Sequence, residues 1–151
     1  MRVLVFVLAT LCVLGACKDR HTSAGGVPIV DMPKDDPRIA QATADAKKDW
    51  PKFVAAFKNP AGKRGFAVKT DFPIKTGGNE HMWIMVTALD KDRVTGTLDD
   101  QPRGDIAHKG GDVITISPDR VEDWVYMDGK TMVGGYSVAV MRELEEQQKN
   151  K

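Results

Sequence analysis

The chain has 151 residues, a length that suits one folded domain with its own core. Lysine and arginine number 22 and aspartate and glutamate 21, and the two signs are mixed along the chain, so no basic region favours nucleic acid. Hydrophobic residues make up 42%, which is ordinary for a folded protein and argues against general disorder.

The N-terminus predicts a secretory signal. After Arg2, residues 3–14 ("VLVFVLATLCVL") are almost wholly apolar, and so short a run does not span a bilayer comfortably as a permanent helix. The run ends in "LGAC" at residues 14–17, which resembles the lipobox of bacterial lipoproteins. The resemblance implies cleavage after residue 16 and lipidation of Cys17, and the alternative is an uncleaved anchor.

Lipid on Cys17 would determine where the protein is found. Cys12 would leave with the signal, so the mature domain would contain neither a thiol nor a disulfide. Because two or more acyl chains anchor a protein stably, we expect the domain to be held on the periplasmic side of a bacterial membrane. In the lipoproteins that this signal resembles, aspartate directly after the cysteine favours the inner membrane. Lys18 therefore favours the outer membrane, although Asp19 leaves the inner membrane open.

Residues 35–59 predict the first helix. Asp36 suits the N-cap and Pro37 the first helical position. Pro51 is expected to kink the helix or break it into two. One stripe recurs every three or four positions, and we interpret it as core, a binding groove of its aromatic residues being the alternative. The stripe comprises Ile39, Thr43, Ala46, Trp50, Phe53 and Phe57.

After residue 65 the hydrophobic period changes to two, which predicts strands. Residues 66–72 alternate as a strand with one buried face, whereas 80–90 is apolar on both faces and is expected to be central. Further strands are expected at 93–98 with a bend or bulge at Gly96, at 113–116, at 121–127 and, after a turn at Asp128-Gly129, at 131–133. The last segment is expected to be helical and then charged.

A helix followed by short strands with tight turns predicts an α+β fold. We expect the N-terminal helix to pack on a strongly curved antiparallel sheet or small open barrel. The expected organisation is a signal peptide at 1–16, a lipidated tether at 17–34, a single domain at 35–142 and a charged tail at 143–151.

Seven short motifs occur in a specific order over residues 36–142. They are "GFAVK" at 65–69, "EHMW" at 80–83, "GTL" at 96–98, "QP" at 101–102, "GDVITI" at 111–116, "VEDW" at 121–124 and "DGKTMVGGYS" at 128–137. Together they resemble the YegJ-like bacterial family, domain of unknown function 2314. The resemblance implies no activity, cofactor or substrate. Some relatives occur as envelope lipoproteins, and a related group resembles immunity proteins that neutralise toxins.

Glu80 and His81 are the first candidates for chemistry, either as a general base with its orienting partner or as metal ligands. Adjacent strand residues point to opposite faces, so the two side chains do not converge readily on one metal or one proton. We therefore interpret Glu80 as a cap at the start of the strand or as a partner of a lysine such as Lys69. His81 should share a face with Trp83.

An enzymatic hypothesis stays open beside this one. A hydrolase or metal-dependent enzyme would use Glu80, His81, Asp112 and Asp123, with His108 as a further ligand. The remaining histidine, His21, lies in the tether. The phosphate-binding patterns GxxxxGK[ST] and GxGxxG are absent from the sequence, as is the serine motif GxSxG. We therefore expect no nucleotide and no cofactor.

Non-enzymatic binding is the favoured hypothesis. Aromatic and polar residues of the strands could line an exposed sheet face that binds a protein partner in the envelope. The alternative is that Trp83 and Trp124 pack in the core. The candidate binding surface comprises Lys69, Glu80, His81, Trp83, Asp112, Asp123, Trp124 and Tyr136.

Overall fold

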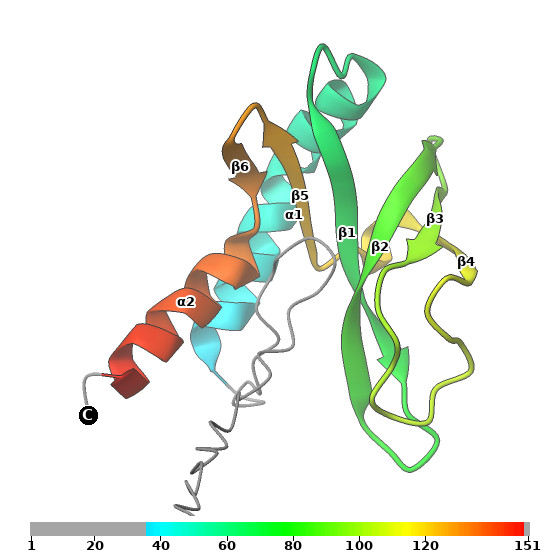
Figure 1. The fold of residues 1–151 in the computed structure, drawn as a ribbon, viewed down its shortest axis with the longest axis vertical. Coiled ribbons are helices and arrows are strands. Elements are labelled where there is room, and N and C mark those ends of the chain that lie inside the picture. The colour runs from blue at the N-terminus through cyan, green and yellow to red at the C-terminus, as the bar shows by residue number, and fades with distance from the viewer. Residues whose placement is uncertain (1–35, 150–151) are drawn as a thin grey trace, which may run out of the picture.

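The computed structural model describes residues 36–149. The predicted signal peptide, Cys17 and the tether lie outside the described residues. The elements are α1 (Pro37–Lys58), β1 (Arg64–Pro73), β2 (Asn79–Leu89), β3 (Val94–Leu98), β4 (Val113–Ile116), the short 3-10 helix η1 (Pro118–Arg120), β5 (Asp123–Asp128), β6 (Thr131–Gly134) and α2 (Tyr136–Lys149) (Figure 1).

The six strands form one antiparallel sheet in the order β4-β3-β2-β1-β5-β6. The sheet is not closed, and β4 and β6 are its edges. The predicted α+β class is confirmed, as is the central position of β2. The bulge expected near Gly96 is present as a register shift on β2, between Val86 and Ala88.

Helix α1 begins as the sequence predicts. The Asp36 carboxylate accepts a hydrogen bond from the Arg38 backbone N–H at 3.0 Å, and Pro37 occupies the first turn. The break considered at Pro51 does not occur, because α1 is a single helix through Lys58. The helix tolerates the missing Pro51 N–H because its apolar stripe is firmly packed, with Phe53 fully buried.

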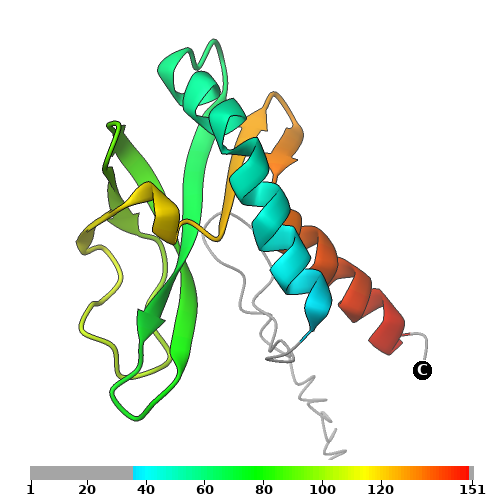
Figure 2. The same cartoon turned by 180° about the vertical axis from the view of Figure 1, so that it is seen from behind.

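Helix α1 crosses one face of the sheet, here termed the inner face (Figure 2). Phe53 lies at the centre of this contact, with ring centroids 5.6 Å from Trp124 and 5.7 Å from Phe66. The indole Nε1 of Trp124 donates a hydrogen bond of 2.8 Å to the carbonyl oxygen of Ala46. The core is thus built between α1 and the inner face, and the opposite face is here termed the outer face.

Strand β1 differs from its prediction of one buried face. On the inner face Val68 and Thr70 are fully buried, but Ala67 and Lys69 of the outer face are also only 6% and 7% exposed. The reason is tertiary: α2 begins over this part of the outer face, where Ser137 lies 3.4 Å from the Lys69 ammonium.

The C-terminal segment is helical, as predicted, and α2 continues past residue 142 to Lys149. None of the helices between residues 36 and 149 is long and apolar enough to cross a membrane.

Candidate functional site

Strand register places one row of residues across the outer face. Ala67 pairs with Val125 on one side and with Met85 on the other. Met85 in turn pairs with Thr97, and Thr97 pairs with Val113 of edge strand β4. Since paired residues of antiparallel strands share a face, these side chains form a continuous band from β5 to β4.

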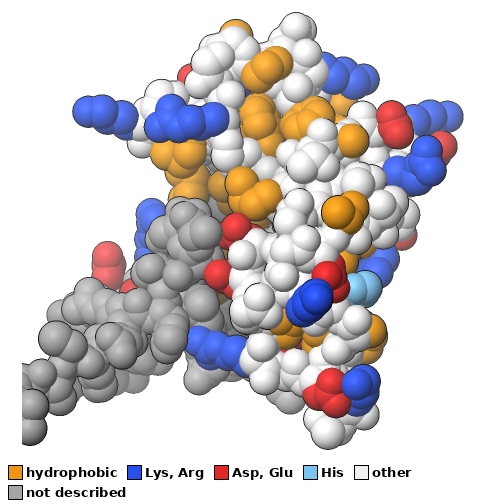
Figure 3. Space-filling view, turned by 45° about the vertical axis from the view of Figure 1, so that its right-hand side comes forward, with side chains coloured by type: hydrophobic (Ala, Val, Ile, Leu, Met, Phe, Trp, Pro, Cys, Tyr) orange, Lys and Arg blue, Asp and Glu red, His pale blue; other side chains and the backbone are white. Residues whose placement is uncertain are grey.

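The band changes from buried to exposed along its length. Ala67 and Val125 are 6% and 8% exposed, whereas Met85 and Thr97 are half-buried and Val113 is 74% exposed. Trp83, also half-buried, lies in the next row on the same face. Trp83, Met85, Thr97 and Val113 are here termed the outer patch. On this side of the molecule apolar side chains gather between charged ones (Figure 3).

His81 lies beside the outer patch and shares its face with Trp83, as predicted. Its Nδ1 is 2.6 Å from the carboxylate of Glu122, so Glu122 rather than Glu80 is its partner. His81 is also paired across the strands with Asp71, which accepts a hydrogen bond from Arg120 at 3.1 Å. Sequence analysis missed Glu122. The only signal for it lies in the pairing of β1 with β5, which brings residues 41 positions apart together.

Glu80 binds the backbone of a loop and does not contact His81 through its carboxylate. Its carboxylate accepts hydrogen bonds from the backbone N–H groups of Arg103 at 2.9 Å and Gly104 at 2.8 Å. The predicted pairing with Lys69 is therefore wrong, because Lys69 is on the outer face and Glu80 is paired with Phe72 of the inner face. Glu80 fixes the loop that follows β3.

Asp123 is fully buried and accepts four hydrogen bonds. Oδ2 receives the backbone N–H of Ser137 at 2.8 Å and its hydroxyl at 2.6 Å. Oδ1 receives the backbone N–H groups of Trp124 at 2.7 Å and Tyr136 at 3.1 Å. Asp123 thus ties the start of α2 to β5, and it is not part of an exposed surface.

Lys69 completes this buried group, because its ammonium donates to the Ser137 hydroxyl at 3.4 Å. Burial lowers the pKa of Lys69, and the negative charge of Asp123 opposes that shift only in part. Burial likewise raises the pKa of Asp123, against the hydrogen bonds from Ser137. Ser137 was missed by sequence analysis, since nothing in "GGYS" marks its hydroxyl as buried.

The two remaining aromatic candidates serve the core. Trp124 is 1% exposed, in agreement with the core alternative, and so does not belong to a binding surface. The hydroxyl of Tyr136 donates to Asp49 of α1 at 2.6 Å and links the two helices. Burial and this hydrogen bond raise the pKa of the Tyr136 hydroxyl.

Asp112 lies in the turn before β4, where its carboxylate accepts the Lys109 backbone N–H at 3.0 Å. His108 Nδ1 is 3.9 Å from the same carboxylate. The four residues of the enzymatic hypothesis are not brought together: β4 and β5 are four strand spacings apart in the sheet, roughly 19 Å. Within residues 36–149, no group of three or more His, Cys, Asp or Glu side chains could hold a metal ion.

The fold defines a small α+β protein with an open antiparallel sheet, one half of whose outer face is only partly covered. The chain belongs to a family of uncharacterized proteins conserved in bacteria, DUF2314, whose model matches residues 36–151. The match begins at the N-cap of α1. No curated protein and no solved structure matches the chain.

Proposed function

We propose that the protein is a non-enzymatic binding module of the bacterial envelope, carried on lipid at Cys17, which uses the outer patch to bind a protein partner. The observation that carries the proposal is the outer patch itself. Its apolar side chains become more exposed towards the β4 edge, where Val113 is 74% exposed. Partly exposed apolar patches with a polar margin are typical of protein interfaces.

The margin of the outer patch supports this role. His81 and Glu122 form a close pair there, 2.6 Å apart, and both are partly exposed. Polar and charged groups at the rim of an interface select partners and direct their approach more than they add affinity. The patch therefore combines apolar side chains with polar groups that can discriminate between partners.

The proposed location of the protein in the envelope rests on its sequence. The short apolar run and "LGAC" at residues 14–17 support lipidation of Cys17, and Lys18 supports the outer membrane. The YegJ-like resemblance agrees with an envelope lipoprotein, and an immunity-like role, with a toxin as partner, rests on that resemblance alone. A hydrolase or metal-dependent enzyme has less support, because Glu80, His81, Asp112 and Asp123 have separate partners on separate elements.

Site-specific photo-crosslinking in cells tests the role of the outer patch. A photoreactive amino acid replaces Thr97 at the centre of the patch, and in the control it replaces Ala55, which is exposed on α1. We expect position 97 to give a discrete adduct of higher mass that position 55 does not give. Trp83→Ala should weaken this adduct severalfold, because an interface loses most affinity when a central aromatic side chain is removed.

Three results would contradict the proposal. The first is an equal set of adducts from positions 97 and 55, and the second is no adduct from position 97. The third is a crosslink within one chain, which leaves the mass unchanged and would mean that the patch is covered by the protein itself.

A further inference from the structure

Strand β4 presents unpaired main-chain groups along one edge. In the sheet it pairs with β3 alone. The N–H of Leu98 donates to the carbonyl oxygen of Asp112 at 2.9 Å, which fixes the phase of the ladder. Because hydrogen-bonded pairs alternate in antiparallel sheets, Ile114 and Ile116 bond to β3, whereas the N–H and C=O of Val113 and Thr115 point to the free edge.

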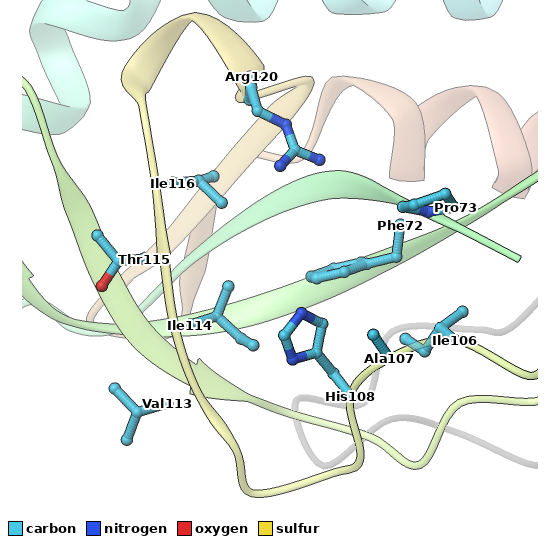
Figure 4. A pocket seen from close by; sticks show the side chains of 10 residues that line it. All are labelled: Phe72, Pro73, Ile106, Ala107, His108, Val113, Ile114, Thr115, Ile116 and Arg120. Atoms are coloured by element: carbon cyan, nitrogen blue, oxygen red, sulfur yellow. The ribbon is translucent and has the colours of Figure 1, made fainter.

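A cavity of about 320 Å³ runs along this edge. All four residues of β4 line it, and the side chains of Ile114 and Ile116 point toward Phe72 and His108, whereas those of Val113 and Thr115 point away (Figure 4). Across from β4 the cavity is bounded by Phe72, Ile106 and His108, with Arg120 at one end (Figure 4). Its size lies at the lower end of ligand-binding cavities.

Arg120 gives the cavity a positive charge that favours acidic groups, and His108 adds a ring nitrogen. Arg120 and His108 approach it from opposite sides in Figure 4. Arg120 uses Nη2 for its bonds to Asp71, at 2.6 Å to the carbonyl oxygen and 3.1 Å to the carboxylate. Its Nε and Nη1 make no hydrogen bond within the described part of the chain. The His108 ring lies edge-on to Phe72, with centroids 5.6 Å apart.

Strand β4 is short, but its four residues include none of the charged or proline residues that protect many edge strands. Natural edge strands are blunted by lysine, proline or a bulge, because a bare edge pairs with other strands. "VITI" at 113–116 has three apolar residues and a threonine, all β-branched, and no charge or proline. It therefore combines strong strand preference with an open ladder.

We propose that the free edge of β4 captures an extended peptide segment of a partner protein by strand addition. The main chain of the peptide bonds to Val113 and Thr115, and its alternate apolar side chains enter the cavity beside Phe72. An acidic side chain of the peptide lies between His108 and Arg120. This site goes beyond the outer patch, because it uses main-chain atoms and does not require the patch to bind anything.

The test uses the full chain, extracted from membranes in detergent micelles and held by a C-terminal tag, and a phage-displayed library of random heptapeptides. Thr115→Pro removes an N–H that points to the free edge and no ladder bond to β3. Thr115→Val is the matched control, because it also removes the hydroxyl that lies 3.0 Å from the Thr95 hydroxyl but keeps the N–H. Circular dichroism verifies that both variants are folded.

We expect enriched peptides with alternating apolar residues and one acidic residue. They should bind Thr115→Pro at least tenfold more weakly than wild type and bind Thr115→Val as wild type does. Replacing the acidic residue by glutamine, or His108 by alanine, should weaken binding severalfold. Trp83→Ala should leave peptide binding unchanged, which separates this site from the outer patch.

Four outcomes would overturn the proposal. One is a lack of enrichment on wild type, and another is equal binding to wild type and Thr115→Pro. A third is a dimer in detergent that Thr115→Pro dissociates, which would assign the edge to a second copy. The fourth is enrichment of peptides that copy residues 18–33, which would assign it to the protein's own N-terminal segment.

Discussion

Asp123 holds its part of the protein together by the number of donors it satisfies. No hydrogen bond joins it to Lys69 directly; the two meet through the hydroxyl of Ser137. A buried carboxylate costs free energy unless its oxygens are bonded, and here four donors from β5 and the start of α2 surround it. Its role is therefore to connect two elements rather than to meet a ligand.

Asp123→Ala should lower the free energy of unfolding by about 3 kcal/mol or more, since it leaves the buried donors of Ser137, Trp124 and Tyr136 without their acceptor. Urea unfolding measures the loss. Asp128→Ala is the control, because Asp128 is exposed at the end of β5 and lies 3.7 Å from Lys63. It should change stability by less than about 0.5 kcal/mol. Similar losses in the two variants would contradict the role given to Asp123.

Lys69 makes the free energy of unfolding depend on pH in the alkaline range. Burial lowers its folded-state pKa below the ordinary 10.5. Between these two pKa values the unfolded chain binds more protons than the folded protein, so the free energy of unfolding rises with pH in this window. Lys69→Met should remove that rise, whereas Lys130→Met, at an exposed turn, should keep it.

Urea unfolding at a series of pH values from about 7 to about 10.5 measures this rise. If the free energies of unfolding of wild type and Lys69→Met change with pH in parallel, the pKa of Lys69 is the same in the folded and unfolded states, which would contradict the prediction.

For single residues, the sequence predicted correctly how side chains alternate between the two faces of the sheet. It did not predict which groups those side chains bind. His81 and Glu80 do have separate environments, as the period of two requires. Their actual partners, Glu122 and the 103–104 loop, are set by strand pairing and loop closure over long sequence separations. Burial of Lys69 follows from the placement of α2, which no local pattern around a lysine indicates.

The secondary-structure elements could be predicted well because their signals are local. Asp36 and Pro37 start α1, the β5–β6 turn lies at Gly129 and Lys130, one residue later than expected, and the change of hydrophobic period separates helix from strands. The helix break considered at Pro51 does not occur, because burial of the apolar stripe around Phe53 outweighs the loss of one backbone hydrogen bond.

The junction from β6 to α2 depends on Gly134. Its φ is +80°, and a Cβ there would collide with the carbonyl oxygen and indole ring of Trp124. Gly134→Ala should lower the free energy of unfolding by more than about 3 kcal/mol, because strain and steric overlap add.

Gly129→Ala is the matched control in the same hairpin. Gly129 has φ +60° but open space around its Cβ position, so only backbone strain of about 1 kcal/mol applies. Thermal and urea unfolding of both variants measure the difference. Equal losses would mean that the approach of Gly134 to Trp124 does not constrain the fold.

For the whole molecule, the α+β class followed from the order of elements, but the shape of the candidate surface did not. Pairing of β1 with β5 passes over three intervening strands in the sequence, and it is this pairing that buries Asp123 and Trp124. Of the predicted surface, His81 and Trp83 lie on the partly uncovered part of the outer face, where Met85, Thr97 and Val113 join them. Which residues of different strands share a face of the sheet is known only once the strand register is known.

The proposed lipid on Cys17 would hold the domain in the envelope and would so limit which partners its outer face can meet. The most direct measurement is the intact mass of the protein extracted from membranes. We predict a chain that starts at Cys17, lacks residues 1–16 and carries the added mass of a diacylglyceryl group and an N-linked acyl chain. A chain that starts at Met1, or one with an unmodified Cys17, would contradict the account.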